Sequence, residues 1–311
     1  MSARFHIPLL CCLFTGSSLA QPGGGSGVYK HELSVTTEND AYLFQEKDAY
    51  YTNGIFLNYR TAYYHGDQKR LSNYELGQKI FTPFRLTIRN KSDIDRPFCG
   101  FLYARFSQTR FLPNSVFQWS ATLGQTGKAS LGEALQDAYH HIFNYKTFNG
   151  WQYQVPDALG LDLSAIYARP VVHNASLELE PMAEASLGMN YTQAGLSANI
   201  CLGHLADDAN SVLWHARADT RNAPKAEWFL FWKPELICQV YNATLQGGLM
   251  FKGNSGVYSD PAPLFFQQSI GICLASGKWS GQLAWISQTR ETPVQIHPQQ
   301  FASIQLNYLM P

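Results

Sequence analysis

The sequence predicts an all-β protein: a closed antiparallel transmembrane β-barrel of about twelve strands, with one short helix in an extracellular loop. Three observations lead to this fold class. Apolar residues recur at every second position in runs of about ten residues, as transmembrane strands require. The chain is 45% hydrophobic and 14% aromatic, yet only 15% charged, against about 25% in ordinary soluble domains. No stretch of about 18 consecutive apolar residues offers a transmembrane helix.

The alternation is clearest between Leu230 and Val240, where every second residue is apolar and the residues between include Lys233 and Glu235. A soluble β-sandwich would show the same period with its apolar face inward, so alternation alone leaves both folds open. The length of the runs and the tyrosines and tryptophans near their ends favour the membrane barrel, because such residues gather at membrane interfaces.

Runs of this kind place the strands along the whole chain. An even number suits a bacterial barrel with both ends on the periplasmic side, and closure avoids unpaired backbone groups in lipid. The final Leu309-Met310-Pro311 differs from the aromatic residue on which such barrels commonly end. The predicted strands are 31–38, 52–63, 72–82, 98–109, 115–124, 158–170, 176–188, 190–203, 228–241, 265–276, 279–289 and 300–310.

The first twenty residues resemble a secretory signal peptide. Arg4 and His6 give a weakly basic start, Ile7 to Phe14 is a short apolar core, and Ser18-Leu19-Ala20 approximates a cleavage site. We therefore expect a signal peptide at 1–20, a barrel domain at 21–311, and export to the bacterial outer membrane.

Composition and motifs exclude several functions. Lys plus Arg and Asp plus Glu are both 23, so the formal net charge is zero and a nucleic-acid partner is not expected. The four cysteines of the mature region form no C-x-x-C or Cys/His cluster, although export permits a disulfide among them. Neither G-x-S-x-G nor H-E-x-x-H occurs. These cysteines are Cys99, Cys201, Cys238 and Cys273.

One segment departs from the two-residue period, and it predicts a helix from Ser130 to about Asn144. Ser130 and Glu133 fit a capping box at its start. Gln136 and His140 are four residues apart and therefore share one face. An isolated helix that carries an imidazole suggests catalysis at the rim of the barrel.

Strand directions bring further polar residues to the same rim. If the first strand runs outward, Asn39 and Asp40 lie at its outer end and Thr52 begins the returning strand. The third strand ends there too, and Arg85, Arg89 and Lys91 follow it. Residues far apart in the sequence would thus meet at the outer mouth.

Several short motifs follow one another in a fixed order along the mature chain. They are Glu38-Asn39-Asp40, Tyr50-Tyr51-Thr52-Asn53-Gly54, Ile80-Phe81-Thr82-Pro83, Asp95-Arg96-Pro97-Phe98-Cys99-Gly100, Gly132-Glu133-Ala134-Leu135-Gln136 with His140, and Gly150-Trp151. This ordered set resembles the lipid A 3′-O-deacylases of Gram-negative outer membranes. The resemblance covers most of the mature chain and is densest between residues 31 and 160. It implies a twelve-stranded barrel, calcium dependence, and hydrolytic removal of the 3′-acyloxyacyl group from lipid A of lipopolysaccharide.

The residue types suit ester hydrolysis. His140 is the natural general base, because a neutral imidazole with a pKa near 6.5 accepts a proton at working pH. Gln136 would orient the ring or the attacking water. Asp40 and Asn39 offer the oxygen ligands that Ca²⁺ prefers, and the ion would act as a Lewis acid.

Two further roles complete the expected site. The resemblance places Thr52 in the active site, either as a donor to the oxyanion or as a residue that holds the site together. Arg85, with Arg89 and Lys91 close behind, would bind a phosphate of the lipid. We expect the protein to act as a monomer among outer-membrane lipids.

The sequence also departs from the family, and other functions stay open. The family tends to place a carboxylate shortly after the helix histidine, whereas residues 143–149 contain none and offer Lys146. Cys99 stands where a small Ala or Ser is expected. The alternatives are a phospholipase A-type esterase and a catalytically inactive barrel that serves as a pore or structural protein.

Overall fold

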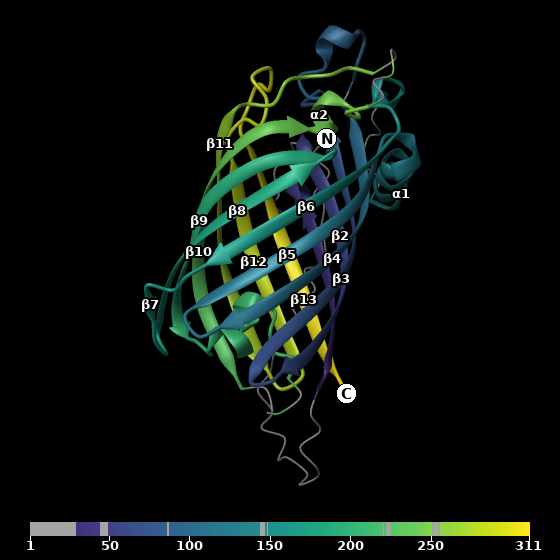
Figure 1. The fold of residues 1–311 in the computed structure, drawn as a ribbon. Helices are drawn as coiled ribbons and strands as arrows, with labels where there is room; N and C mark the ends of the chain where they lie inside the picture. The colour runs from purple at the N-terminus through teal and green to yellow at the C-terminus, as the bar shows by residue number, and fades with distance from the viewer. Residues whose placement is uncertain are drawn as a thin grey trace.

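The computed structural model describes residues 29–43, 49–85, 87–143, 147, 149–219, 221, 225–250, 253 and 256–311. The predicted signal peptide at 1–20 lies outside this part of the chain. Within it, one antiparallel barrel is built from twelve long strands and one two-residue strand (Figure 1). The strands are β1 (His31–Asn39), β2 (Tyr50–His65), β3 (Gln68–Thr82), β4 (Cys99–Leu112), β5 (Ser115–Thr126), β6 (Ala158–Ala168), β7 (Val172–His173), β8 (Leu177–Gly188), β9 (Tyr191–His204), β10 (Glu227–Asn242), β11 (Leu264–Ser276), β12 (Trp279–Gln288) and β13 (Gln299–Met310).

The barrel closes between its first and last strands. β1 pairs with β13 along its whole length, from His31 opposite Met310 to Asn39 opposite Ala302. Every predicted strand is present, with ends shifted by a few residues, and the predicted closed barrel is confirmed. The addition is β7, which pairs with β8 in the connection that follows β6.

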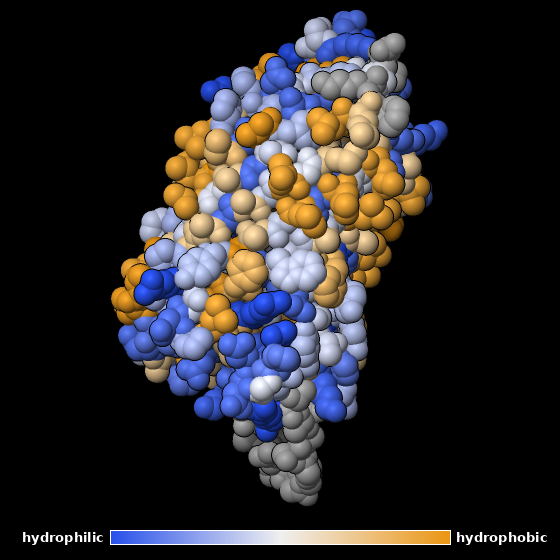
Figure 2. Space-filling view, viewed as in Figure 1, coloured by the Kyte–Doolittle hydropathy of each residue, from blue (hydrophilic) through white to orange (hydrophobic). Residues whose placement is uncertain are grey.

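Alternating side chains give the wall two different faces. On β1, Leu33 and Val35 are exposed on the outside, whereas Glu32 is buried inside and pairs with Arg60 of β2 at 2.7 Å. Figure 2 shows apolar residues gathered around the middle of the barrel's height and hydrophilic residues towards both ends. This apolar belt is the surface that meets lipid. None of the helices in the described ranges is long and apolar enough to cross a membrane.

The two ends of the barrel differ in their connections. The chain's C-terminus lies at the lower end in Figure 1, where Gly66 and Gly277 take positive φ in tight hairpin turns. The upper end carries longer connections and the two α-helices, α1 (Gly132–Phe143) and α2 (Ala243–Gln246). α1 lies on the outside of the barrel near this end (Figure 1).

The β9–β10 connection at the lower end is an exception, because it folds into the lumen. We call residues 205–219 the plug; they include η5 (Asp208–Asn210) and η6 (Val212–Trp214). Trp214 Nε1 donates to Glu180 of β8 at 3.2 Å, and Lys69 of β3 donates to the Ala216 carbonyl at 2.7 Å. The plug therefore bridges two separated strands of the barrel wall, β3 and β8.

Glu227, at the start of β10, holds the plug from its own hairpin. Its carboxylate accepts hydrogen bonds from the Ala206 N–H, the Ser211 hydroxyl and the Val212 N–H at 3.1, 2.6 and 2.8 Å. The Ser211, Val212 and Ala216 positions are buried. A charged acceptor with several donors fixes the segment far better than loose packing would.

The cysteines of the mature region form no disulfide among the described residues. Cys99, Cys201, Cys238 and Cys273 are all free thiols, and Cys238 alone of these is exposed. The barrel is therefore stabilised by its hydrogen-bonded wall and its packed lumen rather than by covalent links.

Candidate functional site

Strand register lines up a row of residues on the outer face near the upper end. Asn39 pairs with Asn53, Asn53 with Ile80, and Ile80 with Gly100. Residues directly opposite each other share one face of a sheet. The row has the same parity as the lipid-facing Leu33 of β1, so it lies outside the barrel.

A β-bulge shapes the second strand of this row. The register shifts between Tyr51 and Asn53, which leaves Thr52 as the extra residue. Thr52 is buried, and its hydroxyl donates to the Ile80 carbonyl at 3.4 Å. Tyr50 begins the strand at a φ of 69°, an uncommon conformation for a bulky residue. Bulges commonly re-aim side chains beside functional sites.

α1 reaches the row through two glycines. A Cβ added to Gly100 would lie 2.8 Å from the Gly132 Cα, so the helix start and β4 touch through their backbones. Gln78 of β3 donates its amide to the Ser130 carbonyl at 2.6 Å. These contacts hold α1 against β3 and β4.

The helix begins differently from the prediction. Ser130 lies in a separate short helix, η3 (Lys128–Ser130), and its hydroxyl donates to the Gly127 carbonyl at 2.5 Å. Leu131 takes a φ of 60°, and its carbonyl accepts from the Leu135 N–H at 3.0 Å. The predicted start at Ser130 is therefore wrong by two residues, because a left-handed residue separates η3 from α1.

One stripe of α1 faces the wall. Gly132, Gln136 and His140 follow at four-residue intervals and all three are buried, whereas His141 and Ile142 are exposed. Gln136 is 4% and His140 3% exposed. Their predicted common face is confirmed, and it is the buried face of an exposed helix.

Trp151 fixes one end of the Gln136 amide. The indole N–H of Trp151 donates to Gln136 Oε1 at 3.0 Å, and the Trp151 ring packs on Phe98 with centroids 5.2 Å apart. Gln136 Nε2 is buried and has no hydrogen-bond partner in the described part of the chain. Trp151 thus fixes the orientation of the amide and leaves its N–H donor without an acceptor. A buried donor without an acceptor destabilises the folded state unless a ligand or a water accepts its hydrogen bond.

Buried oxygens gather where β1 turns into η1 (Asp40–Leu43). Asn39 Oδ1 accepts from the Ala41 N–H at 2.7 Å, and Asp40 Oδ2 accepts from the Ala49 N–H at 2.9 Å. Asn39 and Asp40 are 3% and 5% exposed. Asn53 Oδ1, beside Asn39 in the register, is buried without a hydrogen-bond partner among the described residues.

This donor set fits a calcium ion. Carboxylate and amide oxygens are the ligands that Ca²⁺ prefers, and Asn53 Oδ1 is an orphaned acceptor of the kind that a bound cation satisfies. No sulfur or imidazole ligand that would favour a softer metal belongs to this group of oxygens.

The predicted phosphate-binding residues lie on the connection between β3 and β4. Arg85, Arg89 and Lys91 are all exposed. Arg85 pairs with Asp93 at 2.6 Å. The backbone N–H groups of Arg89 and Asn90 donate to Asp93 and, with Arg85, lower the pKa of its carboxyl. A basic, solvent-facing segment thus borders the site.

Sequence reasoning missed Asn53 and Trp151 as individual site residues. A polar residue at an outward position of β2, two residues before the lipid-facing Ile55, is the signal that would have found Asn53. Trp151 is distant from Gln136 in sequence, and only packing brings their side chains together.

A cavity of about 550 Å³ lies on the other side of the wall, inside the barrel. Glu38, Lys79 and Glu235 line it, and Tyr51 donates its hydroxyl to Glu38 at 2.5 Å. Glu38 and Lys79 directly precede the outward-facing Asn39 and Ile80, so their side chains point to the opposite face of the sheet. The wall therefore separates the cavity from the residues under α1.

Comparison with known proteins identifies one family. The family model described as outer membrane protein LpxR matches residues 8–310. No curated protein matches the sequence. Among solved structures, LpxR from Salmonella typhimurium superposes with a TM-score of 0.72 at 17% identity, over 90% of this chain and 100% of that one. The β domain of the Bordetella autotransporter BrkA follows with a TM-score of 0.46 at 8% identity, over 90% of this chain and 99% of that one.

Proposed function

Because the chain belongs to the LpxR family of outer membrane proteins, we propose that it is a lipid A deacylase that hydrolyses the 3′-acyloxyacyl ester of lipopolysaccharide. The observation that carries this proposal is the buried stripe of α1 with Gln136 and His140, which packs on the outer face of β3 and β4 at the end of the row from Asn39 to Gly100. A catalytic centre outside the barrel meets its substrate in the lipid layer, whereas one in the lumen would not.

His140 acts as the general base. It is buried on the wall-facing stripe of α1, where a neutral imidazole takes a proton from the attacking water as that water adds to the ester carbonyl carbon. The proton then passes to the departing sugar oxygen as the carbon–oxygen bond breaks. The products are the acyloxyacyl chain, released as a carboxylic acid, and a sugar hydroxyl.

Gln136 and Thr52 position the reacting groups. Trp151 holds Gln136 Oε1, so the free Nε2 donor points in one fixed direction. The Nε2 donor orients the water or the ester carbonyl. In that complex Nε2 has the hydrogen-bond acceptor that it otherwise lacks. Thr52, buried in the bulge, bonds the Ile80 carbonyl and keeps β2 and β3 in the geometry that the site requires.

Asp40 and Asn39 would hold a calcium ion, and Asn53 is the further ligand that the geometry adds. When bound, calcium would act as a Lewis acid toward the developing oxyanion. Without the ion, the Asn53 amide keeps an unsatisfied oxygen in a buried position. The basic residues Arg85, Arg89 and Lys91 would bind a phosphate of the same lipid.

The absence of a carboxylate between residues 143 and 149 concerns the orientation of His140. Burial on the wall-facing stripe of α1 restricts the ring. An acid that orients the imidazole and stabilises the imidazolium formed in the reaction can come from any segment packed against this stripe, so the proposed role of His140 does not depend on residues 143–149.

The plug argues against the pore alternative. Its hydrogen bonds reach β3, β8 and β10 from inside the lumen, so ions meet a packed segment at the lower end. The phospholipase A-type alternative is separated from the proposed function by its substrate, so the experiment offers both lipids.

The test is mass spectrometry of lipids after incubation with the purified protein. Lipid A and phospholipid are offered separately, with calcium or with a chelator, to the wild type and to Asp40→Asn. We expect loss of the 3′-acyloxyacyl mass from lipid A only, only with calcium, and only by the wild type. Cleavage of phospholipid alone would establish the rival esterase, and intact lipids under every condition would contradict hydrolysis.

A further inference from the structure

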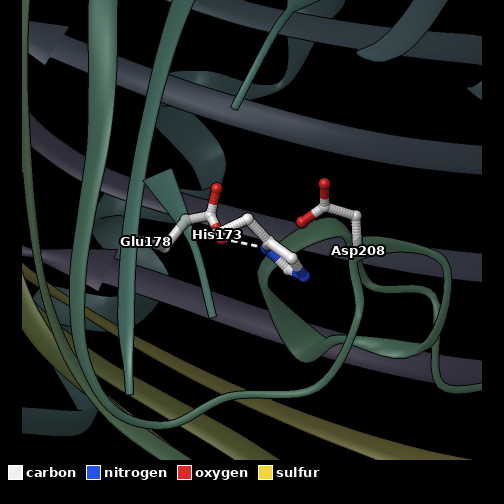
Figure 3. A group of neighbouring side chains, drawn as sticks. All are labelled: His173, Glu178 and Asp208. Carbon is white, nitrogen blue, oxygen red and sulfur yellow. Dashed lines mark hydrogen bonds and ion pairs between the residues drawn. The ribbon is translucent and has the colours of Figure 1, made fainter. Parts of the chain in front are cut away.

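A second cluster of side chains that can bind metal lies at the lower end of the barrel, whereas α1 lies at the upper end. His173 of β7, Glu178 of β8 and Asp208 of the plug each offer one ligand atom, and these atoms lie within 4.8 Å of one another. Figure 3 shows the imidazole between the two carboxylates, which come from the wall and from the η5 turn. The cluster therefore joins the plug to the barrel.

Glu178 is the residue that points to a ligand. It is 1% exposed, and its Oε2 is hydrogen-bonded to His173 Nδ1. Its Oε1 is buried and has no hydrogen-bond partner in the described ranges. Buried carboxylate oxygens in proteins are almost always satisfied, and an unsatisfied one destabilises the fold, more so when it is charged.

Glu180, the next inward-facing residue of β8, also has a buried carboxylate oxygen without a hydrogen-bond partner in the described part of the chain. Glu180 is 0% exposed, and its Oε1 also lacks a partner among the described residues, although Oε2 accepts from Asn199 and Trp214. Two neighbouring buried acids thus each keep one oxygen without a partner in the described ranges, and a bound cation is a group that would satisfy such oxygens.

The surroundings of Asp208 are acidic. A carboxylate oxygen of Asp208 lies within 4.8 Å of the ligand atoms of Glu178 and His173. Glu227 faces the same region, but its oxygens are already occupied by donors of the plug. Asp207 lies 3.6 Å from the other ring nitrogen of His173. Like charges held this close repel one another unless a cation stands between them.

We propose that a divalent transition-metal ion of the zinc class binds His173, Glu178 and Asp208 and fastens the plug to the barrel wall. One imidazole nitrogen with carboxylate oxygens is a ligand set for zinc rather than for calcium or magnesium, which prefer oxygen alone. Three protein ligands leave room for a water in the usual four-coordinate arrangement. Binding of the ion would release the proton of the His173–Glu178 hydrogen bond to solvent, and a Glu178 carboxylate that binds through both oxygens would also give Oε1 its partner.

The experiment measures zinc binding by the purified, chelator-stripped protein in detergent, with excess calcium to saturate the site under α1. The variants are His173→Gln and Asp208→Asn. The matched control is His204→Gln, an exposed histidine at the same end of β9. We expect the wild type and the control to retain about one equivalent of zinc after desalting, and each cluster variant to bind at least about tenfold more weakly.

Cobalt gives a second readout that does not depend on stability. Co²⁺ in the wild type should show visible absorption bands of a low-coordinate site, and His173→Gln should lose them. Zinc should also raise the melting temperature of the wild type but not of His173→Gln, because an ion that binds only the folded state stabilises it. Each variant's fold is checked by its migration on a gel before and after heating.

Two results would overturn the proposal. One is a correctly folded wild type that retains no zinc and shows no cobalt bands. The other is equal zinc affinity in the wild type and His173→Gln, which would place the metal elsewhere. In either case the cluster is an ion pair between His173 and Glu178 with an acidic neighbour.

Discussion

The upper and lower ends of the barrel use connecting segments in opposite ways. At the upper end, α1 folds over the outer face and buries Gln136 and His140 against it. At the lower end, the plug folds into the lumen and buries Ser211 and Val212 there. The same alternating wall thus carries the proposed site on its lipid side at one end and the plug on its lumen side at the other.

Polar residues are tolerated differently on the outer face and in the lumen, and the row from Asn39 to Gly100 lies on the outer face. A polar group left in hydrocarbon without a partner costs several kcal/mol, so Asn39 and Asn53 cannot face bare lipid. The inward Glu32 instead meets Arg60 and pairs inside the barrel. Buried polar residues on the outer face therefore point to function more strongly than those in the lumen.

The sharpest test of the upper end is His140→Ala. Loss of a general base lowers the rate by about 10²- to 10⁴-fold, and initial rates of lipid A deacylation measure it. The control is His141→Ala, because this neighbour is exposed and faces away from the wall. Equal losses in both variants would mean that the helix, rather than the imidazole, matters.

The next largest effect is expected from Gly100→Val. The new side chain would begin 2.8 Å from the Gly132 Cα, so α1 must move away from the wall. Displacing a catalytic group by about 1 Å costs up to about 100-fold in rate. Ala104→Val, on the lipid-facing side of the same strand, should leave the rate unchanged. Full activity in Gly100→Val would show that contact between α1 and β4 is dispensable.

Asn53→Ala should weaken calcium activation. Removing one oxygen ligand raises the calcium concentration that gives half-maximal activity by about tenfold. The rate at saturating calcium should remain close to that of the wild type. Asn73→Ala, an inward-facing amide further down β3, serves as the control. An unchanged calcium requirement would remove Asn53 from the ligand set.

Arg85→Ala should raise KM by about tenfold with little change in kcat, because a hydrogen bond to a charged group contributes about 1.5 kcal/mol at an exposed site. Arg221→Ala changes an exposed arginine at the lower end and should leave KM as it is. Steady-state kinetics on lipid A with and without its phosphates distinguish a phosphate contact from a general charge effect.

Glu227→Gln is the complementary test of the lower end and should leave deacylation unaffected. The loss of charged hydrogen bonds weakens the plug by about 2 kcal/mol, so ion conductance in planar bilayers should rise. Glu235→Gln, on the same strand but lining the upper cavity, keeps the plug in place. Conductance that is equally high in the wild type would restore the pore as a function.

The sequence predicted the barrel well because its signal is local. Alternation over about ten residues is visible within each strand, and the 31–38 and 300–310 segments both appear as strands that pair to close the barrel. The wall-facing stripe of α1 was also predictable, since Gln136 and His140 are only one turn apart.

Long-range features were not predictable in the same way. The row from Asn39 to Gly100 depends on the register of three strand pairs and on a bulge at Thr52. The plug appears in the sequence as an ordinary connection, because its hydrogen bonds join it to residues such as Lys69 that are more than a hundred positions away. Glu178 and Glu180 of β8 are buried beneath the plug, and the alternation within β8 cannot show a cover that comes from another segment.

The seam between β1 and β13 has a consequence for assembly. It joins the first and last strands of the barrel, so it cannot form before the whole chain has been delivered to the membrane. Contacts between such distant segments form slowly. The plug belongs to the earlier β9–β10 hairpin and can enter an open sheet from the side. We expect the plug to enter the lumen before β1 pairs with β13, and this pairing then encloses it. The order of these two folding steps would decide whether the plug lies inside the barrel.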